Sequence, residues 1–158
     1  MTSHTVDRTG LLCGQYCLYR LLQARGINCS LPMVCSHTIQ GATAAIIDAL
    51  LAGNVAILDT VPELKADLEL GTPTIVLADA ARRLGLADLL LTGLPSVQDD
   101  VDAEAKRLGV PLPPFQQLDD REEAIALLQK RAPLLACIWS GSCDWSHEIG
   151  RASCRERV

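Results

Sequence analysis

The sequence has few of the features that mark several large classes of protein. Aromatic residues make up 3% of the chain and the net charge is −5, so there are few rings to stack on bases and no basic field for a phosphate backbone. No apolar run reaches the roughly 18 residues of a membrane-spanning helix, and MTSHTVDRTG at the N-terminus lacks the apolar centre of a signal peptide. The chain has no G-x-G-x-x-G pattern or phosphate loop. We therefore expect a cytoplasmic protein with no nucleic-acid partner and no membrane span.

The cysteines also lack the usual patterns. None of them forms a C-x-x-C pair, which argues against a zinc finger, and without a secretion signal a disulfide framework is not expected. The seven are Cys13, Cys17, Cys29, Cys35, Cys137, Cys143 and Cys154. A metal or iron–sulfur site formed by Cys13, Cys17, Cys35 and His37 stays open as an alternative, because such ligands can be irregularly spaced. Apart from that alternative, the sequence indicates no cofactor.

The most informative stretch is 11–27, LLCGQYCLYRLLQARGI. Its leucines recur at helical spacing and Gly26 supplies a stop, so we predict a helix that starts at Cys13. Because the unpaired N–H groups of a first helical turn carry partial positive charge, they stabilise a thiolate at this position. Cys13 is therefore a candidate nucleophile, although cysteines also serve as small hydrophobes in protein cores.

The rest of the chain divides into short elements of mixed type. We predict a short helix within 27–38, with Ser30 as its N-cap. Further helices are predicted at 41–54, 62–70, 98–109 and 119–131. We predict strands at 54–61, 87–93 and 132–139. Residues 71–86 fit either a strand or a capped helix, and the prolines of 110–115 favour a loop or an edge strand.

With these elements in place, a resemblance emerges. The stretch 11–34, LLCGQYCLYRLLQARGINCSLPMV, resembles the opening of the bacterial papain-like peptidases that cleave double-glycine leaders from bacteriocins, in which a Cys followed by Gly heads the first helix. Segments 71–86 and 132–139 are similar to a later helix of that family and to the strand before its catalytic His. The resemblance implies an α+β, papain-like fold, with N-terminal helices followed by a small sheet. It also implies a cysteine peptidase, a hydrolase, with Cys13 as the nucleophile, His147 as the general base and a peptide or protein as the substrate.

One position departs from the family's pattern. The family has a Gln a few residues before the nucleophile, which helps to bind the oxyanion. The stretch 6–12, VDRTGLL, contains no Gln, and Gln15 lies on the other side of Cys13. We therefore expect a peptidase-like domain that either cleaves a peptide through a Cys–His pair or binds one.

We interpret the C-terminal residues as a non-native addition to the protein. Residues Glu148 to Val158, EIGRASCRERV, back-translate to a DNA sequence that resembles a common short-read sequencing adapter. We accordingly treat 1–147 as a single truncated domain and 148–158 as a non-native tail. The acidic residue that would orient His147 is then expected beyond the truncation.

A parallel α/β sheet is the alternative fold. The apolar runs 54–61, 73–79, 88–93 and 133–139 alternate with predicted helices, which is typical of a three-layer α/β domain. Such a domain would bind a ligand at the carboxyl ends of its strands, or an iron–sulfur cluster on the N-terminal cysteines.

Overall fold

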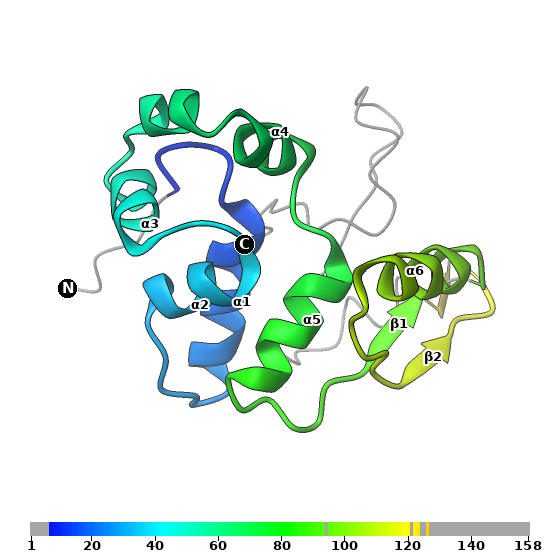
Figure 1. Ribbon diagram of the computed structural model, residues 1–158. Coiled ribbons are helices and arrows are strands. Elements are labelled where there is room, and N and C mark those ends of the chain that lie inside the picture. The colour runs from blue at the N-terminus through cyan, green and yellow to red at the C-terminus, as the bar shows by residue number, and fades with distance from the viewer. Residues whose placement is uncertain (1–6, 94, 121, 124–125, 127–158) are drawn as a thin grey trace.

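A computed structural model describes residues 7–93, 95–120, 122–123 and 126. This part of the chain is mainly helical, with one pair of short strands near its end (Figure 1). The elements in order are α1 (Cys13–Ala24), α2 (Leu31–Thr38), α3 (Ala44–Leu51), the 3-10 helix η1 (Val55–Thr60), α4 (Pro62–Leu70), α5 (Thr74–Arg83), β1 (Leu91–Gly93), α6 (Pro95–Leu108) and β2 (Phe115–Gln117). The predicted strand 132–139, His147 and the tail 148–158 lie outside the described residues.

The first three helices form where the sequence predicts them. Helix α1 begins at Cys13 and ends before Gly26, whose φ of +71° suits glycine. Helix α2 is capped by Ser30, whose side chain accepts the Met33 N–H at 3.3 Å. In the same way, Thr43 caps α3. The predicted helix at 62–70 is also confirmed, because it matches the bounds of α4.

The predicted strand at 54–61 is wrong. Residues Val55–Thr60 form η1, and the Thr60 hydroxyl donates to the Ile57 carbonyl at 2.7 Å. A short apolar run does not reveal by itself whether it is a strand or a buried helical turn. Here the turn buries Leu58 completely against the helices.

Two clusters of buried side chains hold the helices together. The first joins α1 to α2, α3, η1 and α4 and includes Leu12, Tyr16, Cys35, Ile47, Leu50, Leu58 and Leu64. The second joins α1 and α2 to α5 and includes Leu18, Leu22, Val34, Leu77, Ala80 and Ala81. Helices α1 and α2 contribute to both clusters, so the other helices are placed against this pair.

Residues 71–86, whose sequence fits either a strand or a helix, contain helix α5. The alternative α/β interpretation treats 73–79 as a strand, and like 54–61 this segment is helical. The three-layer α/β fold is therefore wrong for the described residues. The helix begins directly after Pro73, without a side-chain cap, and its buried residues Ile75, Leu77, Ala78, Ala80 and Ala81 recur at helical spacing. This helical pattern prevails over the β-branched residues at its start.

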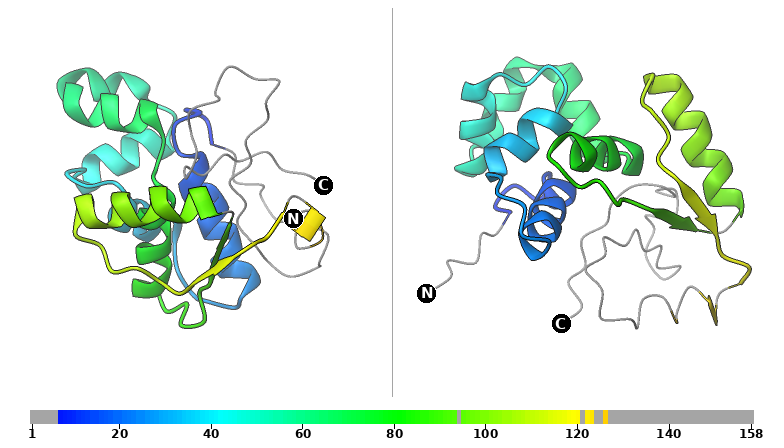
Figure 2. Two further views of the ribbon diagram at one scale, coloured as in Figure 1. Left: turned by 90° about the vertical axis from the view of Figure 1, so that its right-hand side faces the viewer. Right: turned by 90° about the horizontal axis from the view of Figure 1, so that it is seen from below.

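A small parallel sheet follows the helices. Strand β1 pairs with β2 in the register Leu91–Phe115 and Gly93–Gln117, and α6 connects them (Figure 2). Ile75 of α5 packs with Val101 and Ala105 of α6. These buried side chains form a third cluster, which attaches α6 to α5. The described part of the chain therefore has an α+β character, with helices first and a small sheet after them. In the described residues, no helix is long and apolar enough to cross a membrane.

Candidate functional site

The structure places Cys13 at the first residue of α1, as the sequence predicts. Its side chain is a thiol and the residue is half-buried, so it is neither sealed in the core nor fully exposed. This position faces the unsatisfied end of the helix, where backbone N–H groups favour negative charge. Cys17, one turn later, is disulfide-bonded, which the sequence analysis did not expect, and so offers no thiolate.

Asp7 organises the turn that leads into Cys13. Its carboxylate accepts the backbone N–H groups of Thr9 (3.0 Å), Gly10 (3.2 Å) and Leu12 (2.9 Å). The N-cap residue of α1, Leu12, has no side-chain cap of its own, so Asp7 supplies a substitute from five residues upstream. Asp7 lies in the stretch 6–12, where the family that the sequence resembles has a Gln.

Asp7 was not among the residues that the sequence analysis singled out. The spacing D-x-T-G does carry a signal, because Asp and Asn accept backbone N–H groups two or three residues on and so initiate turns. Here the turn continues to Gly10, whose φ of +70° completes it. This geometry sets the direction in which the chain enters α1.

Gln15 ties the first turn of α1 to the start of α5. Its side chain is completely buried, and its Nε2 donates to the hydroxyl of Thr72 at 2.8 Å. Its Oε1 atom is buried without a hydrogen-bond partner. The Gln15–Thr72 pair therefore holds the helix that carries Cys13 against the turn before α5.

Two further thiols in the described part of the chain, Cys29 and Cys35, have different surroundings. Burial, and to a lesser degree the Asp7 carboxylate, raises the pKa of the Cys35 thiol to about 12. Burial also raises the pKa of Cys29, which is half-buried. Cys35 is fully buried. Both environments favour the neutral thiol over the thiolate.

The alternative metal site has no counterpart among the described residues. Among the residues that the structure describes, there is no group of three or more His, Cys, Asp or Glu side chains placed to hold a metal ion. Cys13, Cys17, Cys35 and His37 all lie in this part of the chain. Because Cys35 is buried inside α2 while His37 is exposed, the two side chains of that helix point into different environments.

His147, the predicted general base, lies outside the described residues. The arrangement of Cys13 and His147 therefore stays a prediction.

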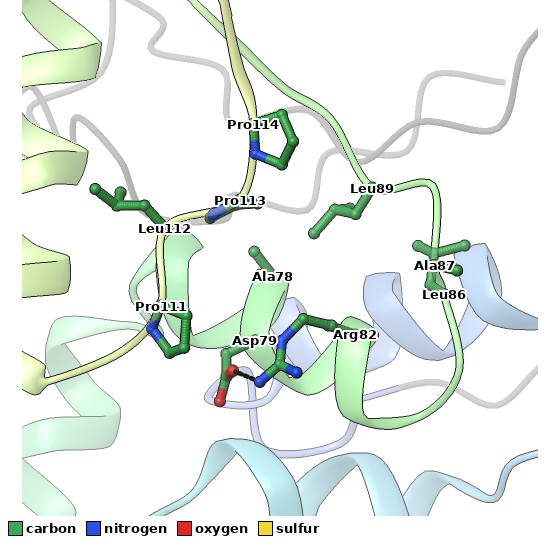
Figure 3. A pocket seen from close by; sticks show the side chains of 10 residues that line it. All are labelled: Ala78, Asp79, Arg82, Leu86, Ala87, Leu89, Pro111, Leu112, Pro113 and Pro114. Atoms are coloured by element: carbon green, nitrogen blue, oxygen red, sulfur yellow. Dashed lines mark hydrogen bonds and ion pairs between the residues drawn. The ribbon is translucent and has the colours of Figure 1, made fainter.

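A pocket lies between α5 and the segment Pro111–Pro114 (Figure 3). Its volume is about 160 Å³. The walls are mainly apolar, but Asp79 and Arg82 line one side, joined by an ion pair of 2.9 Å. None of the predicted site residues lines this pocket.

Comparisons with protein families, with curated proteins and with solved structures find no match for this chain.

Proposed function

We propose that this chain is a papain-like cysteine peptidase domain that acts on peptides through Cys13 and His147. The observation that carries the proposal is the place of Cys13, a half-buried thiol at the first residue of α1. Two further features agree with it: the sequence resemblance around the Cys–Gly pair, and the order of N-terminal helices followed by a small sheet. The adapter-like tail 148–158 has no role in this proposal.

The proposed chemistry has two steps. His147 takes the proton of the Cys13 thiol, and the sulfur attacks the peptide carbonyl carbon. The C–N bond then breaks, the imidazolium returns the proton to the leaving amine, and a thioester remains on Cys13 until water hydrolyses it. The Leu12 N–H is donated to Asp7 and is therefore not available to a substrate. We assign oxyanion stabilisation to the backbone N–H groups that follow Leu12 in the first turn of α1.

The surroundings of the other thiols support the choice of Cys13. Cys35 is buried with its pKa raised to about 12, and burial also raises the pKa of Cys29, which directly precedes the N-cap of α2. Neither position favours a thiolate, whereas a helix start does.

A cleavage assay tests the proposal. The full chain is incubated with peptides that contain a double-glycine leader, and the products are identified by mass spectrometry. We expect cleavage after the Gly–Gly pair, lost by about 10³-fold or more in Cys13→Ala and in His147→Ala. The matched control Cys29→Ala removes a half-buried thiol from the same chain and should cleave at the wild-type rate.

Two results would redirect the proposal. Equal cleavage by wild type and Cys13→Ala would remove Cys13 from the chemistry. Saturable binding of the leader peptide by the wild-type chain, without cleavage, would point instead to a noncatalytic peptide-binding domain.

A further inference from the structure

The pocket beside α5 has the size and lining of a site for a small aliphatic group. Ala78, Leu86 and Leu89 form one side of it, and Pro111 and Pro113 face them (Figure 3). Its volume of about 160 Å³ is close to that of an apolar cavity of about 150 Å³ that holds benzene. A leucine-sized side chain therefore fits, whereas a drug-sized ligand does not.

The charged wall of the pocket consists of one carboxylate, Asp79, and one guanidinium, Arg82. Both carboxylate oxygens of Asp79 are engaged, one with Arg82 at 2.9 Å and the other with Arg83 at 2.8 Å. Arg83 does not line the pocket, but it shares the Asp79 charge from outside, so Arg82 is not the sole partner of that carboxylate. The Asp79 side chain is 10% exposed and that of Arg82 is 54% exposed, so Arg82 can meet a ligand from solution.

Arg82 also has hydrogen-bond donors to offer. A guanidinium carries five N–H donors in a planar fork that matches a carboxylate. The bond from Nη2 of Arg82 to Asp79 uses one of them. In Figure 3 the Arg82 side chain lies along the pocket wall, on the opposite side from Pro114.

We propose that this pocket binds a free carboxylate that carries a branched aliphatic group of leucine size. The aliphatic group fills the space between Ala78, Leu89 and Pro113, and the carboxylate pairs with Arg82. This chemistry occurs both in small branched-chain acids and at the C-terminus of a peptide that ends in leucine. The inference is independent of the proposed peptidase activity, because it uses none of the residues assigned to that function.

Titration of the ¹⁵N-labelled full chain with 4-methylpentanoate tests the proposal by NMR. We expect saturable amide shifts at Ala78, Leu86 and Leu89, with a dissociation constant of about 1 mM for a ligand of this size. The amide analogue, 4-methylpentanamide, has the same shape without the charge and should bind at least about fivefold more weakly. The dipeptide Ala-Leu should bind as well as the acid if a peptide C-terminus is the source, and more weakly if the site takes small acids.

A matched pair of variants separates the proposed contact from a general charge effect. Arg82→Gln should weaken binding of 4-methylpentanoate about fivefold or more. Arg107→Gln removes a guanidinium from the equivalent i,i+3 ion pair with Glu104 on α6 and should leave the affinity within about twofold. Both arginines are more than half exposed, so neither change should disturb folding.

Three results would overturn the proposal. One is equal binding of the acid and its amide. Another is wild-type affinity in Arg82→Gln. The third is the absence of saturable shifts at the pocket residues up to about 20 mM ligand, since a site of this size and charge should be filled at that concentration.

Discussion

Replacing Thr72 by valine keeps the shape of a buried side chain but removes the acceptor for Gln15. The Gln15 amide is completely buried, and its Nε2 donates to the Thr72 hydroxyl at 2.8 Å. Because Oε1 of the same amide already has no partner, Thr72→Val would leave the whole amide group without a hydrogen bond. An unsatisfied buried donor costs about 1–3 kcal/mol, so we expect the free energy of unfolding to fall by about 2 kcal/mol.

A double-mutant cycle isolates this interaction. Gln15→Leu removes both polar atoms of the amide, and in the Thr72→Val background it leaves two apolar side chains in contact. Replacing both partners of a buried hydrogen bond by apolar groups is nearly neutral. The double variant should therefore regain most of the stability, with a coupling free energy of about 1–2 kcal/mol between the two positions.

Urea denaturation followed by circular dichroism at 222 nm measures these values, since the described part of the chain is mainly helical. Thr92→Val, on the half-buried strand β1, is the matched control and should change stability by less than about 0.5 kcal/mol. If Thr72→Val matched this control, or if the two substitutions were simply additive, the Gln15–Thr72 bond would not hold α1 against α5.

Three other predictions concern Cys35, Asp7 and the tail. The pKa of Cys35 is raised to about 12 from 9.0, so its neutral form stabilises the folded state fully below pH 9, and this contribution is lost as the pH rises toward 12. From about pH 8 to pH 10.5, urea denaturation should show wild type losing about 2 kcal/mol more stability than Cys35→Ala, and parallel curves would contradict the assignment. Asp7→Ala should lower stability by about 1–2 kcal/mol because it removes the cap of the 7–12 turn, while Asp99→Ala on α6 should have almost no effect in the same urea-denaturation measurement. Deletion of 148–158 should leave the melting temperature unchanged to within about 1 °C, and a loss of several degrees would show that the tail packs on the domain.

The helices were the most predictable part of the structure. The Cys–Gly start and Gly26 stop of α1, the Ser30 cap of α2 and the proline at the start of α4 are local signals, and each helix begins where its signal lies. Helix α6 starts at Pro95, three residues before the predicted bound of 98–109. The prediction relied on acids in the first turn, and the actual first turn contains none.

The short apolar runs were less predictable. The runs 54–61 and 73–79 are helical and 87–93 contains only a three-residue strand, because burial in these segments comes from helix packing rather than from a large sheet. Strand β2 begins at Phe115, at the end of a proline-rich stretch predicted as a loop or an edge. Its pairing depends on β1, more than twenty residues away in sequence, which local patterns do not report.

The candidate site also contains one residue whose position could be predicted and two whose roles could not. The position of Cys13 at a helix start follows from local spacing and could be predicted. The role of Asp7 depends on three hydrogen bonds along a non-repetitive turn, and that of Gln15 on a contact with Thr72 across 57 residues. No periodicity marks such contacts, so they emerge only from the folded chain.

The rate of alkylation of each thiol tests the central claim most directly. The native chain is treated with a small excess of iodoacetamide near neutral pH, and modification of Cys13, Cys29 and Cys35 is followed over time by peptide mass spectrometry. If Cys13 is the nucleophile, it should react at least about tenfold faster than Cys29, because backbone N–H groups at a helix start favour an attacking thiolate, while Cys35 should react only as the chain unfolds. Modification of Cys13 at the same rate as Cys29, or more slowly, would contradict the assignment of Cys13 as the nucleophile.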